Sequence, residues 1–342
     1  MEHETEVEIT RYVDGQASSE ELTQERIPEN RLRPKTFAEY PGQDRARENL
    51  KVYVEAARRR GKALDHVLLH GPPGLGKTSL AKIVSHELKT AFVQTSGPAL
   101  DKAGDLAGIL AGLTVNSVLF IDEIHRLSVV VEEILYSALE DFYIDVVVGQ
   151  GPTARSVKMP VVPFTLIGAT TRMASLSSPL VSRFGIRERF EYYCVDSLTQ
   201  IIIRSAGIEN IQLSPEAAKE LAVRSRGTPR IANRLLRRVR DFAEVHDEAI
   251  VSAERVDVAL SSMEIDNRGL EPLDRKIMST LLIQYGGGPV GVETLAHTIG
   301  EDRSTIEEVY EPFLVHNGLI RRGPRGREIT EEGRKHIEQE GF

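Results

Sequence analysis

The chain has 342 residues, 41% of them hydrophobic, and its 43 basic and 51 acidic residues give a net charge of −8. This apolar content can bury a sizeable core, which excludes a wholly disordered protein, and the length suggests roughly two or three domains. No stretch approaches the roughly 18 consecutive apolar residues of a membrane span, and the acidic N-terminus is not a secretory signal. With the single cysteine Cys194, these features predict a cytoplasmic protein.

The negative charge is concentrated at one end. Residues 1–30 hold nine acidic and two basic residues, so this segment alone contributes −7 and the rest of the chain is nearly neutral. We expect residues 1–30 to form a disordered acidic tail. The overall charge argues against a nucleic-acid-binding protein, but its distribution does not.

Residues 31–195 are predicted to form an α/β domain. Short apolar runs alternate there with segments of helical periodicity, such as Lys77–Leu88 and Val129–Phe142. This alternation predicts a parallel sheet covered by helices on both faces. The predicted strands are Val67–His70, Ala91–Thr95, Ser117–Ile121 and Phe164–Ala169.

Two smaller domains are predicted to follow. Residues 196–266 show only helical periodicity, with one apolar face formed by Ile231, Leu235, Val239 and Phe242. Residues 267–342 contain three helical patterns and two short strands joined by a Gly/Pro turn, which is typical of a winged helix-turn-helix. These elements are Asp274–Gln284, Val292–Ile299, Arg303–Leu314, Leu319–Ile320 and Glu328–Thr330.

The segment 71–78, GPPGLGKT, is a phosphate-binding loop between a predicted strand and a predicted helix. Its glycines allow backbone N–H groups to turn toward phosphates at the positive end of the helix. Lys77 would reach the β- and γ-phosphates, the Thr78 hydroxyl would bind Mg²⁺, and Ser79 could add a hydrogen bond. The sequence therefore predicts ATP and Mg²⁺ as ligands.

Polar residues follow two other predicted strands. Asp122 and Glu123 directly follow the predicted strand Ser117–Ile121. Asp122 would hold Mg²⁺ through water, and Glu123 could polarise the attacking water. Thr170 and Thr171 end the last one, at the same edge of the sheet. Arg183, on a predicted loop with no acidic partner nearby in the sequence, fits an arginine finger, and an ordinary surface arginine is the alternative.

Arginines cluster in two places. Seven lie between Arg224 and Arg240, and Arg230 follows a predicted helix start at Thr228 and Pro229. This cluster is either a solvated helix face or a contact with nucleotide, a neighbouring subunit or DNA. Four more lie on the predicted wing at 321–327, which is typical of a DNA-binding surface. The adjacent helix carries Glu307, Glu308 and Glu311 and no base-reading side chain, so we expect backbone contacts without sequence recognition.

In this order, the motifs resemble those of the RuvB family of AAA+ ATPases, from about residue 32 to about residue 330. The matching segments are Arg33-Pro34, Gly42-Gln43, GPPGLGKT, the run from Phe120 to Leu127, Gly168–Arg172, Arg183–Gly185 and Gly227–Arg234. The resemblance implies an AAA+ P-loop domain, a small all-α lid and a C-terminal winged helix. It also implies a homo-hexameric motor that drives branch migration of Holliday junctions on duplex DNA, together with RuvA and the RuvC resolvase.

The resemblance also implies roles for single residues. Arg183 would complete a neighbour's site, Arg230 would be the second sensor, and Thr170 or Thr171 the first. The implied nucleotide contacts are Leu32, Arg33, Gly74, Lys77, Thr78, Ser79, Glu140, Asp141, Phe142 and Tyr193. The implied DNA contacts are Arg303, Arg322 and Arg327, and the hairpin Ile144–Met159 would bind RuvA.

Alternative functions remain at this point. A clamp-loader or initiator-like ATP switch would bind DNA without translocating. A DEAH-box-type helicase would fit residues 122–125 but not the GPPGLGKT loop with a helical lid. An adaptor that binds ATP without hydrolysis would not need Glu123 and Arg183.

Overall fold

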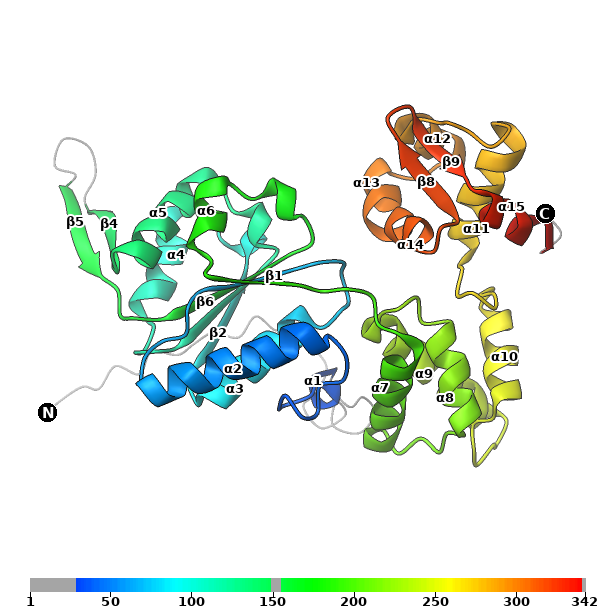
Figure 1. Ribbon diagram of the computed structural model, residues 1–342, viewed down its shortest axis with the longest axis horizontal. Helices are drawn as coiled ribbons and strands as arrows, with labels where there is room; N and C mark the ends of the chain where they lie inside the picture. Colours follow the sequence, from blue (N-terminus) through cyan, green and yellow to red (C-terminus); the bar gives the residue numbers. More distant parts are fainter. Residues whose placement is uncertain (1–28, 149–154, 340–342) are drawn as a thin grey trace, which may run out of the picture. The chain divides into compact units, whose positions relative to one another are not determined.

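The computed structural model describes residues 29–148 and 155–339 (Figure 1). It divides the chain into a unit that ends at Arg33 and one that begins at Pro34. The expected tail lies outside the described residues up to position 28. A short helix, α1 (Glu29–Leu32), begins at Glu29, where the described residues start.

A five-stranded parallel sheet forms the centre of the first large domain. The four predicted strands are present within one residue of their expected bounds. A fifth, β7, has only one apolar residue, Ile186, among four and pairs only with β1 at the sheet's border, so its sequence lacks the apolar run of a central strand. In spatial order the strands are β2 (Phe92–Ser96), β3 (Val118–Asp122), β6 (Thr165–Thr170), β1 (Val67–His70) and β7 (Ile186–Arg189).

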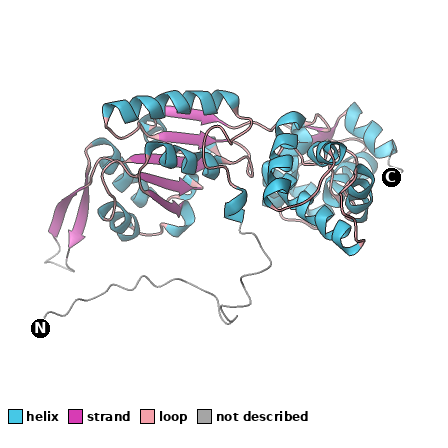
Figure 2. Cartoon of the chain, turned by 90° about the horizontal axis from the view of Figure 1, so that it is seen from below, coloured by secondary structure: helices cyan, strands magenta, loops and turns pink. Residues whose placement is uncertain are grey.

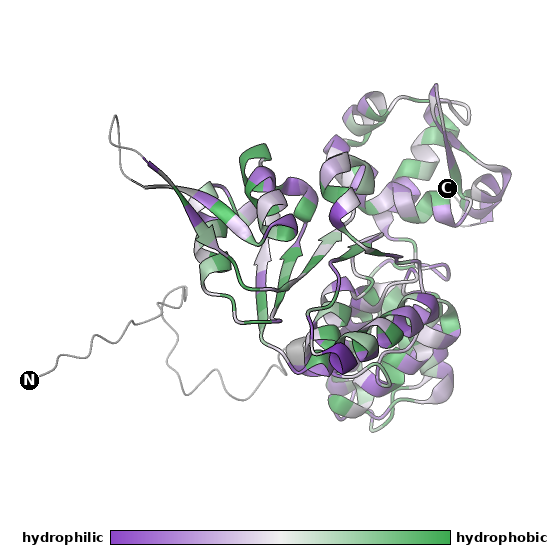
Figure 3. Ribbon diagram, turned by 60° about the vertical axis from the view of Figure 1, so that its left-hand side comes forward, coloured by the Kyte–Doolittle hydropathy of each residue, from purple (hydrophilic) through white to green (hydrophobic). Residues whose placement is uncertain are grey.

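Helices cover both faces of this sheet, as predicted (Figure 2). Because successive strand residues point to opposite faces, Phe120 of β3 joins one apolar cluster and Leu119 joins the other. Figure 3 colours each residue of these strands and helices by its hydropathy. The first cluster includes α2 (Asp44–Arg60) and α3 (Lys77–Leu88), and the second includes α4 (Ala103–Ala111), α5 (Val129–Glu140) and α6 (Ser178–Arg183).

A separate antiparallel hairpin follows α5. Its strands are β4 (Tyr143–Val148) and β5 (Arg155–Pro160), with Ile144 opposite Met159. The hairpin forms its own two-stranded sheet and extends away from the helices beside it (Figure 1). The predicted hairpin is therefore present, while residues 149–154 between its strands lie outside the described residues.

The all-helical domain contains α7 (Val195–Ile208), α8 (Pro215–Val223), α9 (Pro229–Val245) and α10 (Ala253–Ser262). In α9, Leu235 and Val239 are buried, and Ile231 and Phe242 pack partly buried against the same cluster. The predicted apolar face is therefore confirmed.

The C-terminal domain has its own apolar core and is a winged helix. The third predicted helix contains a π-helical turn, Ile306–Tyr310, just before Pro312, whose missing N–H cannot continue the regular ladder. No described helix is long and apolar enough to cross a membrane. The elements are α11 (Pro272–Ser279), a π-turn Thr280–Gln284, α12 (Val292–Ile299), α13 (Arg303–Thr305), α14 (Glu311–His316), β8 (Ile320–Gly323), β9 (Gly326–Ile329) and α15 (Glu331–Gln339).

Candidate functional site

The phosphate loop follows the carboxyl end of β1 and leads into α3. Gly74 has a φ of 77°, and a Cβ at this position would lie 3.2 Å from the Cβ of Arg230. Only glycine satisfies both the left-handed backbone and this close approach. This glycine therefore allows the loop to pack closely against the start of α9, just before the 12-residue helix α3.

Lys77 is the first residue of α3 and is 7% exposed. Its ammonium donates hydrogen bonds of 2.8 Å to the carbonyl oxygens of Gly71 and Pro72. Burial lowers the pKa of Lys77 to about 8, and the nearby carboxylates of Asp122 and Glu123 oppose that shift. A buried cation with only carbonyl partners is suited to an incoming phosphate. Thr78 and Ser79 follow on the same turn, partly exposed.

The strand order brings the predicted polar residues together. Asp122 ends β3, Thr170 ends β6, and β6 lies between β3 and β1. The N–H of Gly71 bonds to the Thr170 carbonyl at 3.1 Å, so the threonine adjoins the phosphate loop. We call this side of the sheet the carboxyl edge. Thr170 is fully buried. Its hydroxyl contacts the ring of His125, which follows Glu123 by two residues.

Two residues beyond the last strand of the sheet, Tyr193 and Arg230, also approach this edge. Arg230 stands on the first turn of α9, after Thr228 at the helix cap and Pro229, as predicted, and its N–H lies 3.4 Å from the Gly74 carbonyl. The Tyr193 hydroxyl donates to the Leu75 carbonyl at 3.1 Å. Both implied nucleotide contacts are therefore adjacent to the phosphate loop.

Arg183 differs from the prediction. It ends α6 rather than lying on a loop, and it forms an ion pair with Glu140. Its guanidinium also lies 4.9 Å from the centre of the Tyr136 ring. The acidic partner was missed because Glu140 is 43 positions away in the sequence and only the fold brings it close.

Arg183 and residues 140–142 lie at the opposite edge, which we call the amino edge. Arg183 precedes β7, whose first residue Ile186 donates to the His66 carbonyl just before β1. The helix end at Leu139 contacts the His66 ring. Because the four residues of β1 span about 13 Å, these groups are separated from their own chain's phosphate loop. Leu32 and Arg33 belong to the N-terminal unit, and their role stays a prediction.

The wing is less basic in space than in sequence. The Arg322 side chain is 61% exposed, and Arg303 is 53% exposed while paired with Glu293 and Glu307. Arg327 is turned inward: its side chain is 7% exposed and lies 2.8 Å from both Glu307 and Glu311. The structure thus gives no support to Arg327 as a free phosphate contact, because acids 16 and 20 positions upstream neutralise it.

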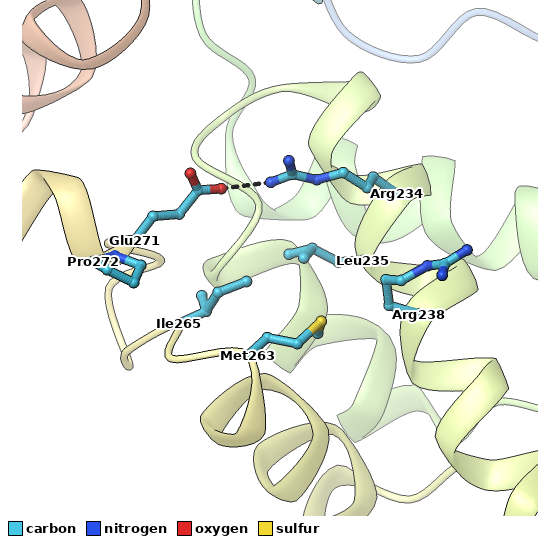
Figure 4. Close-up of a pocket in the computed structure, with 7 residues that line it drawn as sticks. All are labelled: Arg234, Leu235, Arg238, Met263, Ile265, Glu271 and Pro272. Carbon is cyan, nitrogen blue, oxygen red and sulfur yellow. Dashed lines mark hydrogen bonds and ion pairs between the residues drawn. The ribbon is translucent and has the colours of Figure 1, made fainter. Parts of the chain in front are cut away.

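The arginine cluster at 224–240 is mostly structural. Six of its seven members form ion pairs within the chain, for example Arg226 with Asp274 at 3.0 Å and Arg237 with Glu209 at 2.8 Å. Arg234 and Arg238 line a pocket of about 560 Å³ beside Met263, and Figure 4 shows Arg234 paired with Glu271 there. None of the predicted nucleotide contacts lines this pocket. Of the seven arginines, Arg230 is the one that lies beside the phosphate loop. The remaining ion pairs of the arginine cluster are Arg224–Asp257, Arg238–Asp241 and Arg240–Asp241.

Within the described residues, no group of three His, Cys, Asp or Glu side chains could hold a metal alone. The donor set nevertheless fits Mg²⁺ held with a nucleotide, since the Thr78 hydroxyl and the Asp122 carboxylate are hard oxygen ligands. Two residues at this edge had no predicted role. The buried hydroxyl of Tyr40 lies 3.1 Å from that of Tyr193, and His125 contacts Thr170. No sequence pattern marks Tyr40, whereas His125 adjoins the acidic pair.

A strand inserted between the phosphate-loop strand and the acidic strand, together with a helical lid that brings an arginine to the loop, is the arrangement of AAA+ ATPases. Family models of the RuvB P-loop domain, the RuvB AAA lid domain and the RuvB C-terminal winged helix domain match residues 32–190, 193–266 and 267–338. The chain belongs to the RuvB family.

Individual relatives agree with this family. The chain is 54% identical over 323 residues to the Holliday junction branch migration complex subunit RuvB of Parabacteroides distasonis, covering 93% of this chain and 95% of that protein. It is also 54% identical to the subunit of the same name from Lactobacillus delbrueckii subsp. bulgaricus, and the match covers 92% of this chain and 94% of that protein. The solved Thermotoga maritima RuvB Holliday junction branch migration motor is 48% identical, with a TM-score of 0.82 over 90% of this chain and 98% of that one.

Proposed function

We propose that this protein is an ATP-driven motor that moves Holliday junctions along duplex DNA. The observation that carries the proposal is the convergence of Lys77, the acidic pair and Thr170 on one sheet edge. The names of the relatives support a branch-migration motor and not the clamp-loader-like switch.

The carboxyl edge would bind and hydrolyse ATP. Lys77 exchanges its two carbonyl partners for phosphate oxygens, and Glu123 orients the attacking water. Thr78, and Asp122 through water, would hold Mg²⁺, which neutralises charge on the phosphates. Thr170 and Arg230, on different domains, would both respond to the γ-phosphate and so couple it to the lid.

The separation of the two edges supports a ring. Arg183 and the segment Glu140–Phe142 lie away from their own phosphate loop, so a nucleotide that they contact belongs to another subunit. Repetition of that head-to-tail contact closes a ring when the rotation between neighbours divides a full turn, and we propose the hexamer implied by the resemblance. Arg183 would then leave Glu140 for the neighbour's γ-phosphate.

The winged helix would contact the DNA backbone. Arg322 and Arg325 are exposed, and Arg325 has no ion pair among the described residues. Phosphate contacts of this kind carry no sequence information, which suits a motor that must move over any sequence, and their strength falls steeply with salt.

The hairpin would bind a RuvA-like partner. Ile144 is buried at its base, while Val157 is 50% exposed on the outer strand. Because this hairpin does not pair with the central five-stranded sheet, its exposed side chains are available to another protein. RuvC would be reached only indirectly, through the assembled complex.

The proposal is tested with a synthetic four-way junction, a RuvA-like partner and ATP. The wild-type chain should hydrolyse ATP faster with DNA and separate the junction arms. Lys77→Ala should lose nucleotide binding, and Glu123→Gln should bind ATP without turnover. Full turnover by Glu123→Gln refutes the water-positioning role, and ATPase activity without junction movement favours the switch.

A further inference from the structure

His125 lies between the two groups that the proposed hydrolysis step requires. It follows Glu123 by two residues, in the short 3₁₀ turn Ile124–Arg126, and its side chain is 8% exposed. Its Nδ1 is 3.0 Å from the Thr170 hydroxyl, and its Nε2 is 3.5 Å from Oε2 of Glu123. One imidazole therefore spans from the end of β6 to the acidic turn.

The groups on either side of this ring favour one tautomer, because the Glu123 carboxylate near Nε2 can only accept a proton donor. Burial lowers the pKa of His125, which keeps the ring neutral at physiological pH. The Thr170 hydroxyl oxygen already accepts the N–H of Arg172 at 2.9 Å, so its proton is free to be donated to Nδ1. The remaining ring proton then lies on Nε2, which faces the carboxylate. The opposite tautomer would direct a lone pair at that carboxylate.

The backbone at Glu123 is fixed, whereas its side chain is not. Glu123 has a φ of 50°, its N–H donates to Oδ1 of Asp122, and its carbonyl accepts the N–H of Arg126. Its side chain is 37% exposed. Among the described residues, His125 is the one basic side chain with a nitrogen within 4.0 Å of this carboxylate. The imidazole is thus the group that can hold the carboxylate in one orientation.

We propose that His125 is a positioning residue, which orients the Glu123 carboxylate and transmits the position of Thr170 to it. This inference depends on the proposed ATP hydrolysis. His125 contacts neither phosphate nor water in this role. It acts through Glu123, and a shift of the β6 end therefore changes the direction of the carboxylate.

Three substitutions separate the two functions of the ring. His125→Gln can place an amide N–H near the position of Nε2, His125→Asn can place an acceptor near the position of Nδ1, and His125→Leu keeps neither. We expect kcat of the DNA-bound, full-length protein to fall on the order of 10- to 100-fold in the Asn and Leu variants. His125→Gln should recover most of kcat, and KM and nucleotide affinity should change little in all three.

His336→Leu is the matched control. This imidazole is also buried, its Nε2 lies 2.8 Å from Oδ2 of Asp266, and it belongs to α15 of the C-terminal domain. Its replacement should lower the unfolding midpoint without changing kcat. Wild-type kcat in His125→Asn overturns the inference, and so does a loss that is accompanied by weaker nucleotide binding or left unrescued by Gln.

A double variant tests whether His125 acts through Glu123. In the Glu123→Gln background, adding His125→Asn should not lower the residual single-turnover rate further, because the group it positions is gone. A further 10-fold loss would show an independent role and overturn the inference. If the wild type itself does not hydrolyse ATP, or Glu123→Gln is fully active, it is the proposed function that fails.

Discussion

The two edges of the parallel sheet differ in how their charged groups are partnered. At the carboxyl edge, Lys77 is buried and bonded only to carbonyl oxygens, close to acids that it does not touch. At the amino edge, Arg183 is partly buried and paired with the exposed side chain of Glu140. The first arrangement is open to an anion, whereas the second is neutralised within its own chain.

This difference shows why one chain would not form a complete catalytic site. The cation that is suited to stabilise a transition state lies on the edge opposite to the loop that is suited to bind the phosphates. Only contact between the carboxyl edge of one copy and the amino edge of the next would join them. Each prediction below tests whether the two edges act within one subunit or between two.

The largest effect is expected for Arg183→Ala. Loss of an arginine finger should lower kcat by about 10³-fold or more in a pure assembly. Mixed with Lys77→Ala, it should regain activity, because its intact carboxyl edge can meet an intact Arg183 on the neighbour. In a random equimolar mixture up to about a quarter of the interfaces should be functional. The measurement is the ATPase rate with DNA.

The matched control for that mixture is Glu123→Gln with Lys77→Ala. Both substitutions damage the carboxyl edge, so no interface in the mixture is complete and no recovery is expected. Equal recovery in the two mixtures, or none in the first, would contradict a site that is shared between subunits.

A smaller effect is expected for Gly97→Ala. A Cβ at Gly97 would lie 2.4 Å from the Glu123 carbonyl oxygen, so the acidic turn must move. We expect kcat to fall roughly 10-fold with nucleotide affinity retained, and no recovery on mixing with Lys77→Ala. Gly108→Ala in α4 is the control, since its Cβ would meet nothing within 4 Å. Unchanged kcat in Gly97→Ala would show that the turn is not critical.

The carboxyl edge could be predicted from the sequence because its information is local. A strand, a glycine-rich loop and a helix follow one another around Lys77, and the acidic pair directly ends β3. The order of the strands could not be read in this way. It depends on long-range pairing such as His70 with Thr170, and this pairing decides that Thr170 lies between the two motifs.

The charge predictions were weaker because ion pairs form across long sequence distances. Arg183, Arg226 and Arg327 all appear unpaired in the sequence, and each meets an acid that only the fold brings close. A count of charges along the chain therefore overstates the positive surface of both the arginine cluster and the wing.

The smallest effect is expected for Glu140→Gln. Its side chain is 62% exposed, so its pair with Arg183 should contribute less than about 1 kcal/mol to the free energy of unfolding. Asp274→Asn is the contrasting control, because it would leave the 5% exposed Arg226 without its buried acid, at a cost of about 3–5 kcal/mol. Urea unfolding measures both. A loss above about 2 kcal/mol in Glu140→Gln would mean that the pair is needed to hold α5 and α6 together. Arg183 would then not be free to leave it, and the amino edge would be a structural contact within its own chain.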